Sequence, residues 1–107
     1  MANTAKSLSH SALTATTTTT LYTVPAATTT IVKEITVCNT DTVARTVTLQ
    51  AGATTGVADR VLNSMSLAPN ETKVISMSLV LATTQTITGV ASTASVVSCL
   101  ISGVEVV

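Results

Sequence analysis

Few side chains in this sequence could carry acid–base, nucleophilic or metal chemistry. His10 is the single histidine, and the five carboxylates are scattered along 107 residues without any catalytic motif. A Ser-His-Asp relay needs a histidine held on the folded domain, and a zinc site normally needs three or four His, Cys or carboxylate ligands. We therefore expect no catalytic residues, no cofactor-binding residues and no metal site, and we expect the protein not to be an enzyme.

The two cysteines are the remaining reactive groups. Cys38 and Cys99 each stand among aliphatic residues in segments that alternate like β-strands. Such surroundings suit buried thiols that behave as small hydrophobic side chains, although the cysteine count also permits a disulfide. The N-terminus lacks an apolar run of signal-peptide length, so we expect synthesis in a cytoplasm and reduced thiols.

The composition also argues against several kinds of binding protein. The net charge is zero, the five cations are dispersed, and Tyr22 is the single aromatic residue. Nucleic-acid sites use cationic grooves and aromatic platforms, and carbohydrate sites similarly depend on stacking rings. Polar residues interrupt every apolar stretch well before the roughly 18 residues of a membrane helix. We expect neither nucleic acid nor a membrane as a partner.

The elements are predicted to be β-strands. Twenty-four threonines and fifteen valines dominate the chain, and β-branched residues favour a pleated, half-buried surface. Apolar and polar residues alternate in Leu21 to Val24, Thr29 to Cys38, Val43 to Ala51, Thr72 to Leu81, Thr86 to Ser92 and Ala94 to Gly103, with Val104 to Val107 as an extension of the last.

The segment between residues 52 and 65 and the residue Lys33 depart from this simple alternation. Gly52 to Gly56 is predicted to be a loop, and Val57 to Met65 fits either a strand or an irregular connection. Lys33 falls on the apolar parity of its strand, which indicates a bulge or an edge. Seven or eight short strands at this spacing predict an all-β, antiparallel β-sandwich over residues 21–107, for which a jelly-roll and an immunoglobulin-like topology fit equally well.

The first twenty residues differ in composition. They contain mostly Ala, Ser and Thr, with isolated Leu8 and Leu13, and end in the run Thr16 to Thr20. Ordering a backbone costs about 1–2 kcal/mol per residue, which two leucines do not offset. Residues 1–20 are therefore predicted to form an extended N-terminal arm that stays flexible unless it docks on a partner.

Several segments resemble a group of small virion proteins of tailed bacteriophages. The matching segments are Leu21-Tyr22-Thr23-Val24-Pro25-Ala26, Thr30 to Thr40, Leu67-Ala68-Pro69-Asn70-Glu71-Thr72 and Ser102-Gly103-Val104-Glu105. This sequence departs from the group at Ala27 and Asn70, where the group has glycine. The resemblance implies a β-sandwich component of the particle, either a decoration (cement) protein on the capsid or a tail protein, and carries over no functional residues.

Composition and resemblance together suggest a structural role in a virion. We expect a capsid decoration protein that forms a homo-oligomer, specifically a trimer, and that binds the major capsid protein. Apolar strand surface with few charges tends to associate, and its burial between subunits would stabilise the shell. A tail or baseplate adaptor is one alternative, and a head fibre or spike module that binds the host surface is another.

Overall fold

The computed structural model describes residues 3–15, 19–53 and 59–107, and this part of the chain consists of strands and turns. No helix in it is long and apolar enough to cross a membrane. The eight strands are β1 (Asn3–Ala12), β2 (Thr19–Thr23), β3 (Thr29–Asn39), β4 (Arg45–Gly52), β5 (Arg60–Leu67), β6 (Thr72–Leu81), β7 (Thr86–Ala91) and β8 (Val97–Val106).

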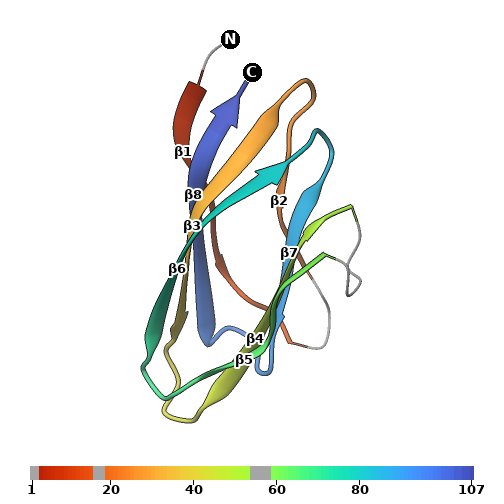
Figure 1. Cartoon of the computed structure of the whole chain (residues 1–107). Coiled ribbons are helices and arrows are strands. Elements are labelled where there is room, and N and C mark those ends of the chain that lie inside the picture. The colour runs from red at the N-terminus through yellow and green to blue at the C-terminus, as the bar shows by residue number, and fades with distance from the viewer. Residues whose placement is uncertain (1–2, 16–18, 54–58) are drawn as a thin grey trace.

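The strands form two four-stranded antiparallel sheets that face each other (Figure 1). One sheet has the order β1-β8-β3-β6 and the other the order β2-β7-β4-β5. Four of the pairings join the first strand to the eighth, the second to the seventh, the third to the sixth and the fourth to the fifth. A ribbon of four such pairs, rolled so that successive pairs alternate between two sheets, is a jelly roll. The strand order thus selects the jelly roll over the immunoglobulin-like topology.

The core lies between the sheets and is built from aliphatic residues. Alternate side chains of each strand point inward, as the pleat requires. The largest fully buried side chains include Ile35 on β3, Leu49 on β4, Ile87 on β7 and Ile101 on β8. Burying such a side chain contributes about 1.5–3 kcal/mol. The β-branched, ring-free composition therefore fills the interior without aromatic residues.

Most of the predicted strands are confirmed, and β6 has the predicted bounds. The ambiguous segment before Met65 contains strand β5, while residues 54–58 of the predicted loop and of that segment lie outside the described residues. The bulge indicated by Lys33 is also confirmed. The register shifts between Val32 and Glu34 against both neighbouring strands, and this exposes Lys33 and Glu34 together.

The predicted N-terminal arm is not what the structure shows for residues 3–15. Asn3–Ala12 pairs with β8 as an edge strand of the first sheet, and Leu8 and Leu13 are buried in the core. The chain then crosses to the other sheet, where the Ala91 amide donates to the Thr14 carbonyl at 2.9 Å. Two buried leucines alone do not offset the cost of ordering this segment, and the edge of β8 supplies the backbone hydrogen bonds that complete the balance. Residues 1–2 and 16–18 of the predicted arm lie outside the described residues.

Ala27 and Asn70 are two of the five non-glycine residues in the left-handed backbone region among the described residues. Ala27 has φ 54° in the connection from β2 to β3, and Asn70 has φ 58° in the connection from β5 to β6. These are the two positions at which the resembled phage proteins carry glycine. Asparagine tolerates this conformation better than most residues, whereas alanine is strained in it. The turn chemistry therefore changes little at Asn70 but costs free energy at Ala27.

Candidate functional site

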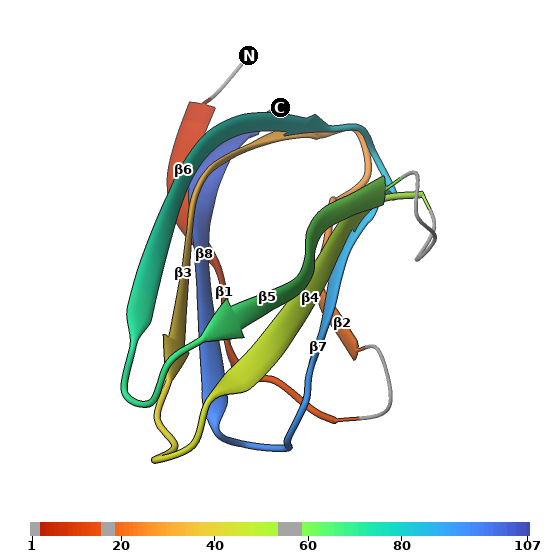
Figure 2. The same ribbon diagram turned by 60° about the horizontal axis from the view of Figure 1, so that its bottom comes forward.

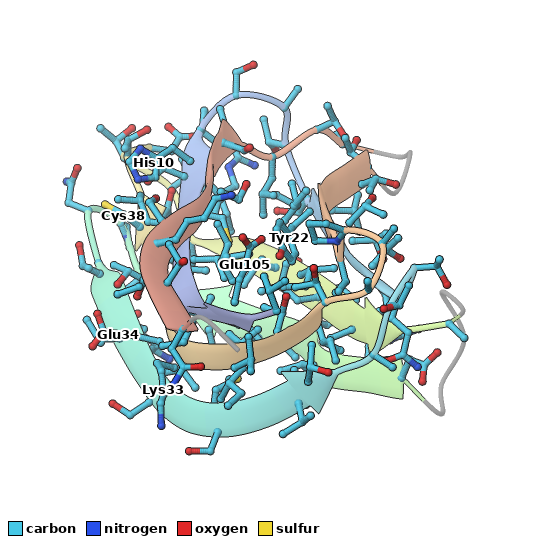
Figure 3. The ribbon with its side chains drawn as sticks, turned by 90° about the horizontal axis from the view of Figure 1, so that it is seen from above. His10, Tyr22, Lys33, Glu34, Cys38 and Glu105 are labelled. Carbon is cyan, nitrogen blue, oxygen red and sulfur yellow. The ribbon has the colours of Figure 1, made fainter. Side chains whose placement is uncertain are left out.

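The most unusual side-chain cluster of the described chain joins both sheets around a buried carboxylate. Glu105 on β8 is 8% exposed, and its Oε2 accepts a hydrogen bond of 2.5 Å from the Tyr22 hydroxyl of β2. The Lys6 ammonium of β1 donates to the other carboxylate oxygen at 3.2 Å. The Tyr22 hydroxyl also lies 2.8 Å from the Thr30 Oγ1 of β3. Figure 3 shows the Tyr22 and Glu105 side chains facing each other between the sheets.

The electrostatics of this cluster favour a neutral phenol beside an ionised carboxylate. Burial, followed by the hydrogen bond to Glu105, raises the pKa of Tyr22 to about 12. The hydrogen bond from Tyr22 lowers the pKa of Glu105, with Lys6 acting in the same direction and desolvation opposing it. Both shifts favour a protonated Tyr22 and an ionised Glu105. In this state the phenol donates a charge-assisted hydrogen bond to the carboxylate.

The arrangement is suited to holding strands together. The cluster takes one residue from each of β1, β2, β3 and β8, so it connects the first sheet to the second. A tyrosine with a pKa near 12 is a poor base at neutral pH, and an ionised, hydrogen-bonded glutamate is a poor acid. We therefore assign the cluster a structural role at the end of the sandwich where both chain ends lie (Figure 1).

A second polar cluster fixes the opposite end of the sandwich. Asn39 is fully buried, and its Nδ2 donates to the carbonyl oxygens of Val43, Leu67 and Ala68 at 3.0–3.3 Å. Its Oδ1 accepts from the Asp41 amide at 3.0 Å, which confirms the turn predicted from Asn39-Thr40-Asp41. A buried amide with satisfied donors and acceptors specifies one arrangement of the chain around it. Asn39 thus joins the turn after β3 to the turn after β5.

Asp41 also forms an ion pair with a neighbour in the same turn. Both the Nε and an Nη of Arg45 donate to Asp41 Oδ2, at 2.9 and 2.7 Å. The hydrogen bonds from Arg45 and then from the Thr42 amide lower the pKa of Asp41. This ion pair stabilises the turn.

His10 lies on β1, so the structure places it on the folded domain and not on a free arm. Its Nε2 is 2.6 Å from the Ser7 Oγ at an exposed position. Among the described residues no group of three or more His, Cys, Asp or Glu side chains is arranged to hold a metal ion. The described chain also has no detectable pocket.

The two cysteines lie on adjacent strands but face opposite sides of the sheet. Val37 pairs with Cys99 and Cys38 pairs with Ser98, so Cys99 points into the core while Cys38 points outward. Both thiols are free, as the sequence predicted, and opposite faces preclude a disulfide between them. Burial raises the pKa of Cys99 to about 12, which makes its thiol unreactive at neutral pH.

Glu105 is one of the five carboxylates described above as scattered, and the cluster around it was not predicted. The available signal was its parity, since Val97, Cys99, Ile101 and Gly103 face inward at alternate positions and Glu105 continues that series. A carboxylate at an inward position must find a donor. Tyr22, which has the only phenol in the sequence, is a candidate for that donor.

Comparison with models of known protein families, with curated proteins and with solved structures finds no match for this chain. The class that the structure itself defines is an all-β, eight-stranded antiparallel sandwich with jelly-roll strand order.

Proposed function

We propose that this protein is a structural subunit of a tailed-bacteriophage virion, specifically a capsid decoration (cement) protein. Its role is to bind copies of itself and the major capsid protein, and so to stabilise the shell. The proposal rests on the sequence resemblance and on the character of the exposed strand surface. The number of copies in the homo-oligomer, expected from the sequence to be three, is not part of this proposal and is addressed in the next subsection by mass measurements.

The main structural support for the proposal is the exposed apolar surface of strands β6 and β8. Val74 and Val80 on β6 are 58% and 62% exposed, and Leu100 on β8 is 43% exposed. No carboxylate, amine or guanidinium group occurs between Val74 and Val104. Lys33 and Glu34 on β3 are the charged residues exposed between these two strands. Large apolar side chains on strands with so few charges are typical of surfaces that are covered in an assembly. The burial of such a face between shell proteins would oppose shell expansion.

The fold is compatible with this role. Jelly rolls recur in viral capsid proteins, although they also occur in lectins and cupins. The ring of the single tyrosine, Tyr22, is partly buried and packed against the core, so it is not a free platform for a sugar ring. A module that binds host glycans is therefore less well supported than a capsid protein. The jelly-roll fold does not decide between the two, because fold alone does not assign function.

The proposal is tested by locating the protein on particles. Purified phage particles from a host that expresses the gene are labelled with antibodies against the recombinant protein and viewed by electron microscopy. We expect label on the capsid surface. Label confined to the tail or baseplate would replace the capsid assignment with the adaptor function, and particles without the protein would overturn both.

A second experiment tests stabilisation directly. Particles that lack the protein are heated with and without added recombinant protein, and DNA release is followed with an intercalating dye. We expect the added protein to raise the temperature of DNA release. An unchanged release temperature at full capsid occupancy would show that binding does not reinforce the shell.

A further inference from the structure

Strand β6 is an open edge of the first sheet. It pairs with β3 on one side, and no described strand pairs with its other side (Figure 2). It is ten residues long, and Lys73, near its beginning, is its only charged residue. Natural proteins usually protect such an edge with charges, proline, a short length or a β-bulge, because free N–H and C=O groups recruit another strand. Beyond Lys73, β6 has no further charge and no proline, and it has one bulge, where Met77 and Ser78 lie opposite Lys33.

The side chains of β6 form a palindrome on the exposed face. Val74, Ser76, Ser78 and Val80 are exposed in turn, while the intervening residues point toward the core. In an antiparallel pair, residues directly opposite each other lie on the same face. A second copy of β6 placed antiparallel with Met77 opposite Met77 therefore sets valine against valine and serine against serine. A shift of two residues in either direction destroys this match.

We propose that β6 is a homodimer interface, in which two copies pair antiparallel about a two-fold axis through Met77 and form a continuous eight-stranded sheet. A two-fold contact uses the same patch on both subunits, so the patch must be complementary to itself. The palindrome of β6 meets this requirement. The bulge of β6 lies at this axis, where Met77 and Ser78 are opposite Lys33 of β3. It leaves the palindrome in place, because exposed and inward positions alternate throughout Thr72–Leu81.

The inward residues of β6 support the same arrangement. Ile75, Met77 and Leu79 point toward the core but remain partly exposed at the edge, where no described strand lies beside β6. An added strand lies about 4.8 Å away and would cover that flank. In the proposed register Ile75 faces Leu79 of the second copy, so aliphatic side chains meet on the inner face as well.

The apolar rows on the outer face would also become continuous. Val80 pairs with Ile31, and Ile31 pairs with Val104, so these three residues form a row across three strands. Val74 begins a second row through Thr36 to Leu100. In the proposed register, Val80 of one copy meets Val74 of the other, and the two rows join across the axis. Cross-strand contacts of this kind stabilise sheets.

The first test compares two double variants of Val74 and Val80 that differ only in the sign of the charge at position 80. In Val74→Glu/Val80→Glu every new carboxylate faces another across the axis, whereas in Val74→Glu/Val80→Lys each faces an ammonium. We expect a wild-type dimer by light scattering and native mass spectrometry. The first double variant should raise the dimer dissociation constant at least about tenfold, and the second should restore dimerisation. The two positions are too distant within one strand for an internal pair.

A matched control places the same carboxylate elsewhere. Val43 is 53% exposed in the turn after β3, and Val43→Glu should leave the dimer intact. A monomeric wild type, a trimer, or equal masses for the two double variants would overturn the proposal. Because these masses are measured without particles, their outcome is independent of the capsid assignment.

The second test reads the register. In a Cys38→Ser background, Met77→Cys places two thiols opposite each other on the axis, within the Cα separation that a disulfide allows. Ser76→Cys places them diagonally, about 7–8 Å apart. We expect mild oxidation to cross-link the Met77→Cys dimer rapidly and the Ser76→Cys dimer much more slowly. Equal rates, or no cross-link at Met77, would contradict the register.

Discussion

Ala27 occupies a backbone conformation that normally selects glycine. Its φ of 54° places the Cβ close to the following carbonyl. We predict that Ala27→Gly raises the free energy of unfolding by about 0.5–1 kcal/mol, because relief of strain exceeds the added entropy of the unfolded chain. Urea unfolding would measure this change.

Asn70→Gly is the matched control for that substitution. Asn70 has a similar φ of 58°, but asparagine tolerates it. The stability should change by less than about 0.5 kcal/mol. A destabilised Ala27→Gly variant would show that the alanine side chain contributes more by packing than it costs by strain.

Glu105 makes the stability depend on pH in the acid range. Its pKa is lowered by Tyr22 and Lys6, so the stabilisation is present above the unfolded carboxyl pKa of about 4.3 and is lost as the pH falls through the lower folded value. Glu105→Gln should cost about 1.5–3 kcal/mol at pH 7, the usual contribution of a hydrogen bond to a charged group. At a pH below the lowered folded pKa of Glu105, the variant and the wild type should converge.

The measurement is urea unfolding at several pH values, with Glu34→Gln as control. Glu34 is an exposed carboxylate on β3 with no hydrogen bond or ion pair described for its side chain. Its substitution should leave the acid profile unchanged. A Glu105→Gln curve parallel to the wild type at all pH values would refute the role of the buried carboxylate.

At the scale of elements, β1 is the segment that was predicted to be a flexible arm and is instead an edge strand paired with β8. Leu13, just after β1, is 1% exposed, and its amide donates to the Val97 carbonyl at 2.8 Å. We predict that Leu13→Ala lowers the free energy of unfolding by about 2–4 kcal/mol through a core cavity. Leu100→Ala, at a 43% exposed site on β8, should cost much less.

The same substitution distinguishes a docked strand from a free arm. If residues 3–15 were detached from the sandwich in solution, Leu13→Ala would leave the unfolding curve unchanged. A deletion of this segment is a poor test of particle binding, because it would also expose the edge of β8 and empty part of the core.

The strands that could be predicted from sequence are those whose pattern is local. The alternation in Thr72–Leu81 identifies β6 without reference to any other strand, and Lys33 reveals a bulge by breaking the same alternation. By contrast, β1 has mostly exposed polar side chains, and its position depends on pairing with a strand about ninety residues later.

Long-range pairing also explains what the sequence left open. Jelly-roll and immunoglobulin-like sandwiches give the same alternation along each strand, so the topology depends on which strands pair. The Glu105 cluster takes residues from four strands, and its members become neighbours only when those pairings exist. The palindrome of β6, in contrast, is visible in the sequence, but its meaning depends on β6 being an edge.

For the whole molecule, stability should be greatest between about pH 5 and pH 8. The lowered pKa values of Glu105 and Asp41 remove stability on the acid side. Tyr22 and Cys99 have pKa values raised to about 12, so their contributions are complete below the unfolded values of about 10 and 8.5 and are lost as the pH rises toward 12.

Unfolding temperatures measured from acid to alkaline pH should be constant between about pH 5 and pH 8 and should fall on both sides of that interval, along an acid and an alkaline limb. Tyr22→Phe keeps the ring but removes the titrating hydroxyl, so the alkaline limb should become shallower between about pH 10 and pH 12. An alkaline limb identical to that of the wild type would show that the phenol does not contribute to it.

The pairing of the first strand with the last also brings the two ends of the molecule together. Asn3 and Val106 are cross-strand partners at one end of the sandwich (Figure 1). A linker of a few residues would therefore close the backbone into a ring, and a circular permutant opened in the connection between β6 and β7 would keep every strand pair. Any peptide fused to either terminus would emerge from this same end, which makes the opposite end available for immobilisation or display.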